Sequence, residues 1–332
     1  MTFAGSPDRV EARLVPEAGF EFDGFRVSGL PRRLSPGLVR ASGRAAWAPV
    51  ACRRILARRR PDVVLGGGGY VAGPMVLAAW TMRIPAALTE ADAHLGLANR
   101  LAAPYARRVF LAYELPGRRG PKYRVVGRPI PARSKPIPRD EARAVFGLPQ
   151  DGPVLAVFGA LAGARSLNEL AVEAFGLAGP GQKERSSAPA VLHVSGRRDY
   201  DALRPRVSRE RYVLLPETDQ FGAAISAADL VLARAGGSVW EIAAAGRPAV
   251  LVPYPYATGD HQAKNARHFQ TAGGAICVPE TDLGSVPELV RSLLDDPPRR
   301  ARMGEAMRRA ARPNAAAEIA DDLIRLAGSR AH

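Results

Sequence analysis

The stretch from residue 230 to residue 265 constrains the fold most, because short apolar runs alternate there with glycine turns and helical patterns. The run at 230–233 is short enough for a buried parallel strand. Gly236 and Gly237 follow it, and two adjacent glycines let the backbone turn tightly and lie close to a ligand. A helix is then expected at 238–245, a strand at 249–253 and a polar helix start after Gly259. This order predicts a ligand site on two successive strand-to-helix turns.

The residue types at these turns suit a phosphate and neighbouring hydroxyl groups. A helix N-terminus offers backbone N–H groups and partial positive charge, which favour a phosphate. Ser238 is a candidate N-cap and Glu241 completes a capping-box pattern. The Glu241 carboxylate could accept hydrogen bonds from two ribose hydroxyls, or it could only complement the helix dipole. A nearby cluster of polar residues suited to sugar hydroxyls favours the ligand-binding role of Glu241 over the helix-dipole role. The cluster comprises Asp260, His261, Gln262 and Asn265.

The same pattern recurs along the chain. Glycines follow the expected strands at 62–65 and 154–158. Further strands are expected at 20–22, 25–27, 85–89, 109–112, 123–126, 191–195, 212–215 and 275–279. Alternating strands and helices in both halves predict an α/β protein with two doubly wound parallel-sheet domains. We place these at 1–131 and 139–332, on either side of a proline-rich linker, with a last helix that could pack back on the first domain.

The charge distribution indicates an anionic partner. The net charge is +15, and ten arginines with no acidic residue lie between Asp23 and Asp62. Apolar residues such as Trp47 and Leu56 interleave with them, a pattern that suits an anionic membrane surface. The alternative that this segment is only a solvated basic surface remains open. Nucleic acid is not expected as a partner, because no nucleic-acid-binding motif is recognisable. No apolar run approaches ~20 residues and no signal peptide is evident, so we expect a cytoplasmic protein.

The segment 234–255, followed by 260–266, resembles the donor-binding region of MurG-type enzymes. These are the N-acetylglucosaminyltransferases that complete lipid II in peptidoglycan synthesis. The resemblance covers nearly the whole chain, including 66–74, 125–129 and 159–168. It implies the GT-B fold, two Rossmann-like domains with a cleft between them. It also implies UDP-N-acetylglucosamine as donor, polyprenyl-linked lipid I as acceptor, no cofactor or metal, and a peripheral location on the cytoplasmic face of the cell membrane.

The resemblance also implies the site residues. Positions that match those used for the nucleotide sugar are Asp92, Arg165, Ser195, Thr218, Ser238, Glu241 and Gln262. The matching glycine loops hold Gly66, Gly67, Gly68, Gly69, Gly159, Gly163, Gly236 and Gly237. In an inverting transfer, preorganised N–H groups and Arg165 would stabilise the departing diphosphate. Asp92 and His94 are candidates for the general base by position only, and a structural role is equally open for each. His193 lies in an apolar strand and is expected in the core.

The chain departs from the family pattern at three places. It lacks the initial strand and the glycine loop ending in histidine. Thr-Glu-Ala-Asp at 89–92 replaces His-Glu-Gln-Asn, and Ala-Leu at 160–161 replaces Gly-Ser. The simplest account is a start codon placed too late; a truncated, inactive protein is the alternative. A different GT-B enzyme, such as a glycolipid transferase or an epimerase, and a non-enzymatic nucleotide-sugar and membrane-binding module also remain open.

Overall fold

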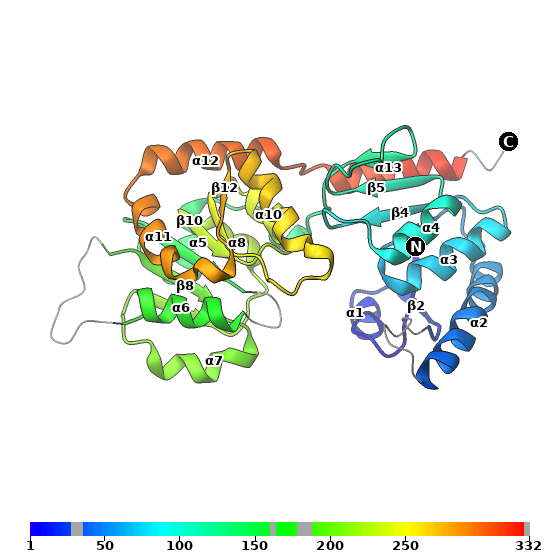
Figure 1. The fold of residues 1–332 in the computed structure, drawn as a ribbon, viewed down its shortest axis with the longest axis horizontal. Coiled ribbons are helices and arrows are strands. Elements are labelled where there is room, and N and C mark those ends of the chain that lie inside the picture. The colour runs from blue at the N-terminus through cyan, green and yellow to red at the C-terminus, as the bar shows by residue number, and fades with distance from the viewer. Residues whose placement is uncertain (28–35, 160–163, 178–187, 329–332) are drawn as a thin grey trace. The chain divides into compact units, whose positions relative to one another are not determined.

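The computed structural model describes residues 1–27, 36–159, 164–177 and 188–328, with only the backbone for 36–46. The chain forms two compact units (Figure 1). The first comprises residues 1–126 with 316–332, and the second comprises 127–315. The boundary after the first unit therefore falls five residues before the expected end at 131. The last helix belongs to the first unit and not to a continuous 139–332 domain.

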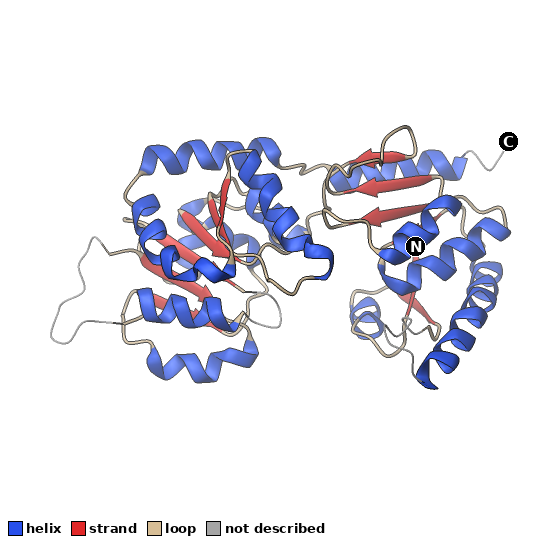
Figure 2. Cartoon of the chain, viewed as in Figure 1, coloured by secondary structure: helices blue, strands red, loops and turns tan. Residues whose placement is uncertain are grey.

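The second unit is a six-stranded parallel sheet with helices between its strands (Figure 2). The strand order is β12-β11-β10-β7-β8-β9. Its strands are β7 (Val154–Phe158), β8 (Ala190–Val194), β9 (Tyr212–Leu215), β10 (Leu230–Ala233), β11 (Ala249–Leu251) and β12 (Ala275–Cys277). Its α-helices are α5 (Arg139–Val145), α6 (Arg165–Phe175), α7 (Arg197–Leu203), α8 (Phe221–Ser226), α9 (Val239–Ala244), α10 (His261–Thr271), α11 (Val286–Leu294) and α12 (Pro297–Ala310).

The strand order positions the candidate site. Strands β7, β8 and β9 extend the sheet in one direction, and β10, β11 and β12 extend it in the other. The order therefore reverses between β7 and β10, which pair directly. Ligands of doubly wound sheets bind beyond the carboxyl ends of the strands at such a switch point. Both central strands are fully buried, as their continuous apolar runs predict.

The first unit contains a four-stranded parallel sheet in the order β3-β4-β5-β6 and a separate pair, β1 and β2. Its strands are β1 (Thr2–Gly5), β2 (Glu21–Gly24), β3 (Val64–Gly66), β4 (Ala86–Glu90), β5 (Arg108–Leu111) and β6 (Tyr123–Val125). Its α-helices are α1 (Glu11–Glu17), α2 (Pro36–Arg59), α3 (Gly69–Thr81), α4 (Leu97–Ala102) and α13 (Ala315–Gly328).

Two expectations for the first unit were wrong. No strand forms at 25–27, because Phe25 only extends the β1–β2 pairing by donating its N–H to the Gly5 carbonyl at 3.0 Å. Leu56 is 4% exposed and packs in the core, so it is not available for membrane insertion. The helix α2 presents Leu56 and Cys52 inward and leaves Trp47 exposed.

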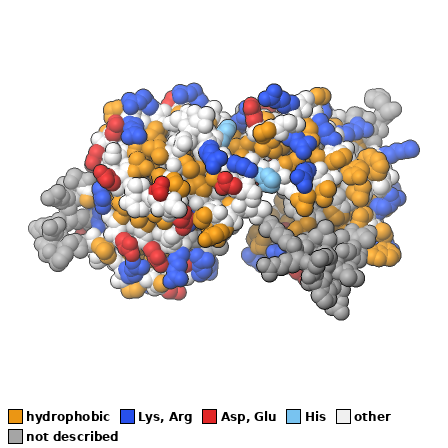
Figure 3. All heavy atoms as spheres, viewed as in Figure 1, with side chains coloured by type: hydrophobic (Ala, Val, Ile, Leu, Met, Phe, Trp, Pro, Cys, Tyr) orange, Lys and Arg blue, Asp and Glu red, His pale blue; other side chains and the backbone are white. Residues whose placement is uncertain are grey.

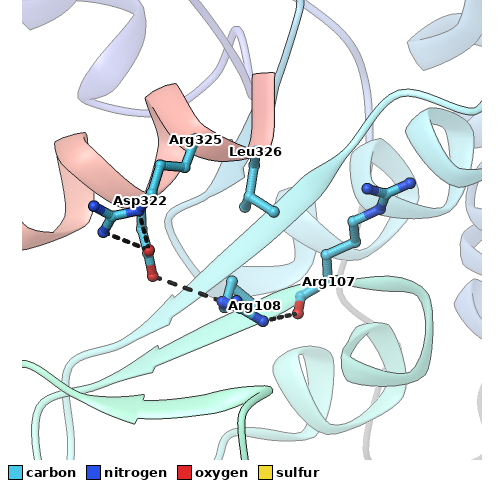
Figure 4. Close-up of a pocket in the computed structure, with 5 residues that line it drawn as sticks. All are labelled: Arg107, Arg108, Asp322, Arg325 and Leu326. Atoms are coloured by element: carbon cyan, nitrogen blue, oxygen red, sulfur yellow. Dashed lines mark hydrogen bonds and ion pairs between the residues drawn. The ribbon is translucent and has the colours of Figure 1, made fainter. Parts of the chain in front are cut away.

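Helix α13 is held to the first unit by a small apolar cluster and by ion pairs. Ile319 and Leu326 pack against Phe110 and other buried residues of the sheet. Figure 4 shows Asp322 of α13 between Arg325 and Arg108, which lies at the start of β5. Burial alone would raise the pKa of the Asp322 carboxyl, but hydrogen bonds from Arg325 and Arg124 hold it below its usual value.

Candidate active site

Arg234 connects the loops on both sides of the switch point. It follows β10 directly and is only 5% exposed. Its guanidinium donates to the Val252 and Pro253 carbonyls at 3.2 and 3.3 Å, and to the Ser166 hydroxyl at 3.0 Å. It also forms an ion pair with Glu280, which accepts a hydrogen bond from Ser166 as well. One buried side chain thus joins the segments that follow β7, β10, β11 and β12.

This pairing determines the charge state of Glu280. Partial burial would raise the pKa of its carboxyl, but the hydrogen bonds from Arg234 and Ser166 lower it below the ordinary value. The carboxylate is therefore ionised at neutral pH, and the Arg234 charge is neutralised locally. The sequence contains one signal for this network, because Arg234 lies between an apolar strand and two glycines. No role was predicted for Arg234 from the sequence.

The turn between β10 and α9 presents unpaired backbone donors. Among the described residues, the N–H groups of Gly236, Gly237 and Ser238 have no acceptor. A Cβ added to Gly236 would meet nothing within 4 Å, so the backbone lies open to a ligand there. Successive unpaired N–H groups in a turn are the donors from which anion-binding concavities are built.

The expected capping box at this turn was wrong. Ser238 has helical backbone angles, φ −61° and ψ −14°, and its side chain makes no capping hydrogen bond. The first N–H groups of the helix are satisfied instead by tight turns, in which Val239 donates to Gly236 and Trp240 donates to Gly237. Neither the Ser238 hydroxyl nor the half-buried Glu241 carboxylate has a hydrogen-bond partner among the residues that the structure places. Both side chains therefore retain their full capacity for a ligand.

The loop after β11 brings Gln262 toward the same edge of the sheet. Gln262 accepts a hydrogen bond from the Tyr254 N–H at 2.9 Å, which leaves its amide NH₂ group without a described acceptor. Asn265 is buried and donates to the Ala235 carbonyl at 3.2 Å, so α10 is tied to the β10–α9 turn. Thr218, before α8, uses its hydroxyl to accept the Gln220 N–H at 3.1 Å.

The other predicted residues of this unit have different surroundings. Arg165 opens α6 with a side chain 78% exposed and pairs with Glu169 at 3.0 Å. Ser195 is fully buried, and its hydroxyl donates to the Gly196 and Leu215 carbonyls, so the hydroxyl is turned into the protein. Gly159 ends the described part of the third glycine loop, and Gly163 lies outside the described residues.

His193 is a core residue, as expected. It is fully buried, with one ring nitrogen 2.7 Å from the Tyr212 hydroxyl and the other 3.0 Å from the Asn168 carbonyl oxygen. Burial lowers the pKa of its imidazole to about 3. The neutral ring donates to Asn168, whose amide in turn donates to Ser195 and Asp199, so this chain of hydrogen bonds supports the loop at Ser195.

In the first unit, a second glycine turn lies between β3 and α3. Gly66 must be glycine because a Cβ there would lie 2.8 Å from Leu88, whereas Gly67 and Gly69 face open space. Gly68 has φ +93° and leads into α3. Glu90, at the end of β4, accepts hydrogen bonds from the Gly96 N–H and the Asn99 amide, both at 2.9 Å. This carboxylate orders the loop that carries the half-buried Asp92 and His94.

The described residues hold no group of three or more metal-ligating side chains. The sequence does contain one Asp-x-Asp triplet at 199–201, a pattern that the prediction of a metal-free site had not taken into account. Asp199 is engaged by Arg198 and Asn168, and these hydrogen bonds lower the pKa of its carboxyl. None of the described helices is both long and apolar enough to cross a membrane.

Two parallel α/β sheets with glycine turns at their carboxyl edges, the second of them doubly wound, define the GT-B fold. The models of the glycosyltransferase family 28 N-terminal and C-terminal domains match residues 2–111 and 154–323. The chain belongs to glycosyltransferase family 28, and within it to the MurG-type enzymes.

Individual relatives agree with this assignment. A UDP-N-acetylglucosamine–N-acetylmuramyl-(pentapeptide) pyrophosphoryl-undecaprenol N-acetylglucosamine transferase from Acidithiobacillus ferrooxidans is 40% identical, covering 99% of this chain and 90% of the relative. The crystal structure of Acinetobacter baumannii MurG is 26% identical, with a TM-score of 0.78, covering 98% and 90% of the two chains. A UDP-GlcNAc 2-epimerase from Neisseria meningitidis shares the fold, with a TM-score of 0.62 at 15% identity, covering 97% and 90%.

Proposed function

We propose that the chain transfers N-acetylglucosamine from UDP-N-acetylglucosamine to the N-acetylmuramyl group of lipid I, which forms lipid II for peptidoglycan synthesis. The observation that carries this proposal is the β10–α9 turn. There three unpaired N–H groups, Ser238 and Glu241 lie at the switch point of a doubly wound sheet. The names of relatives such as the Acidithiobacillus ferrooxidans transferase support the same donor and acceptor.

The geometry suggests roles for the donor-binding residues. The Glu241 carboxylate accepts hydrogen bonds from the ribose hydroxyls, because it is half-buried and has no described partner. The N–H groups of Gly236, Gly237 and Ser238 bind the diphosphate, and the free amide of Gln262 binds sugar hydroxyls. Arg165 is exposed at the start of α6 and can exchange Glu169 for a phosphate.

The proposed contacts support an inverting transfer. The acceptor hydroxyl attacks the anomeric carbon opposite the departing UDP, so the configuration inverts. The bond from that carbon to the β-phosphate oxygen breaks, and its electron pair goes to the diphosphate, where the N–H groups stabilise the charge. The acceptor proton passes to a base, for which Asp92 and His94 are the candidates. No metal is required in this proposal, because fixed protein donors neutralise the leaving group.

A membrane-bound acceptor requires a membrane-facing surface, and exposed apolar side chains of the first unit support one there. Its exposed apolar residues are Trp80, Leu97, Leu101 and Tyr105, with exposed fractions of 55, 58, 62 and 38%. The rings of Trp80 and Tyr105 are in contact, at a centroid distance of 5.1 Å. Figure 3 shows hydrophobic side chains interspersed with basic ones on this unit. We propose that this surface, the α3–α4 patch, binds the anionic cytoplasmic face of the membrane.

The direct test measures transfer of radiolabelled N-acetylglucosamine to lipid I, with EDTA present in one arm. We expect labelled lipid II at the same rate with and without EDTA. Conversion of UDP-N-acetylglucosamine to its C2 epimer without transfer would instead identify an epimerase. Binding of UDP without any turnover of donor would identify a binding module.

A further inference from the structure

Arg128 lies directly against the glycine turn that follows β10. A Cβ built on Gly237 would fall 1.9 Å from one Arg128 guanidinium nitrogen and 2.2 Å from the guanidinium carbon. Gly237 has ordinary negative-φ backbone, so backbone strain does not require glycine there, and any side chain at 237 would have to displace the Arg128 guanidinium. The guanidinium therefore takes the place that a side chain would fill beside the three unpaired N–H groups.

Arg128 differs from the other arginines near this edge in having no described counter-charge. Arg234 is neutralised by Glu280, and Arg165 pairs with Glu169. Within the described part of the chain, Arg128 has no hydrogen bond or ion pair, although it is half-buried. A partly desolvated guanidinium without an anion is costly, and a ligand anion removes that cost.

We propose that Arg128 binds the diphosphate of the nucleotide sugar and stabilises the charge that develops on the departing nucleoside diphosphate. The planar guanidinium offers two parallel N–H donors, a geometry that matches phosphate oxygens. The electron pair of the breaking bond remains on the phosphate oxygen, and the guanidinium stabilises that charge by donating hydrogen bonds. The assignment rests on the proposed function, because it adds a cation to the same donor site.

The test compares ligands with and without phosphates on the full chain. Calorimetry gives the Kd of UDP and of uridine for the wild type, Arg128→Met, Arg128→Lys and a control, Arg133→Met, which removes an exposed arginine from the same segment. We expect Arg128→Met to weaken UDP binding by about 10- to 100-fold, the effect of one charge-assisted hydrogen-bonding group. The Kd of uridine for Arg128→Met should stay within about twofold of the wild-type value. Arg128→Lys should lie between, since it keeps the charge but loses the planar fork.

The transfer reaction gives a second readout. Charge on the diphosphate increases in the transition state, so Arg128→Met should lower kcat in addition to raising KM. If Arg128→Met weakens the binding of UDP and of uridine by the same factor, Arg128 only shapes the turn, and the proposal is overturned. Unchanged UDP binding in Arg128→Met would overturn it too.

A measurement on the unaltered protein covers the case in which Arg128→Met does not fold. Phenylglyoxal modification of Arg128, followed by mass spectrometry, should be suppressed by UDP and not by uridine. Equal protection by both ligands, or protection by neither, contradicts the proposal. A wild type that binds UDP with an unprotected Arg128 overturns this assignment alone. A wild type that binds no UDP overturns the proposed function itself.

Discussion

Replacing Glu280 with glutamine should destabilise the second unit, because it leaves the Arg234 charge buried without a counter-charge. The Arg234 side chain is 6% exposed and the Glu280 side chain is 24% exposed. Breaking a fully buried ion pair by removing one partner costs about 3–5 kcal/mol. Glu280 is a quarter exposed and glutamine keeps an acceptor oxygen, so we expect a loss of about 2–3 kcal/mol in the free energy of unfolding.

Urea denaturation can measure this loss in the second unit alone. The chain has three tryptophans, and Trp240 is buried beside the candidate site. With Trp47 and Trp80 replaced by phenylalanine, fluorescence reports on Trp240. For a slope of about 2–3 kcal/mol per molar urea, the midpoint should fall by about 1 M. The control is Glu305→Gln, which removes an exposed carboxylate paired with Arg308 and should leave the midpoint unchanged.

The pH dependence follows from the lowered pKa of Glu280. A carboxyl whose pKa is lower in the folded state stabilises the fold above its unfolded value and loses that contribution as the pH falls through the folded value. The difference between the wild type and Glu280→Gln should therefore be full at neutral pH and shrink below about pH 4.5. An unchanged urea midpoint at pH 7, or a difference that persists after the carboxyl is protonated, would refute the role of this ion pair.

Three further predictions concern other parts of the molecule. Glu241→Ala should weaken UDP binding by about 10- to 100-fold in calorimetry, but leave the binding of 2′,3′-dideoxy-UDP unchanged, because the lost partner is the ribose diol; equal weakening of both would contradict this. Serine at both Trp80 and Leu101 should reduce binding to anionic vesicles with no change in UDP affinity, whereas unaltered vesicle binding would exclude the α3–α4 patch as the contact surface. Burial raises the pKa of the Cys52 thiol to about 12, so iodoacetamide at pH 8 should alkylate Cys277 and reach Cys52 only after denaturation, a result that mass spectrometry can check.

The fold of the second unit was predictable because its central strands are buried on both faces. A parallel strand in that position is an unbroken apolar run, and 154–158 was identified to the residue. The edge strand at 212–215 is less buried, but its sequence is also apolar throughout and its bounds were identified as well. Peripheral segments carry weaker signals. The strand β1 has only one buried residue, Gly5, so its sequence shows no apolar periodicity, and we did not expect it. Leu56 was misassigned because helical spacing reveals an apolar face but not what covers it.

The candidate site was predictable in its location and less so in its contacts. Glycines after buried strands indicated the turns, since close backbone approach requires them. Which side chains are satisfied internally could not be read from the sequence. Ser195 and Thr218 use their hydroxyls within the protein, whereas Ser238 and Glu241 do not. That distinction depends on loop geometry, which no residue pattern specifies.

Arg128 and Arg234 show what such patterns leave out. Both arginines approach the β10–α9 turn, but one lies 109 residues before Gly237 in the chain and the other lies 3 residues before it. Arg234 is committed to Glu280 and holds the loops together, so its charge is already neutralised when a ligand arrives. Arg128 has no described counter-charge and lies on the glycine. In the proposed diphosphate site the two arginines have different roles, because Arg234 is already neutralised and fixes the loops, whereas Arg128 supplies the charge.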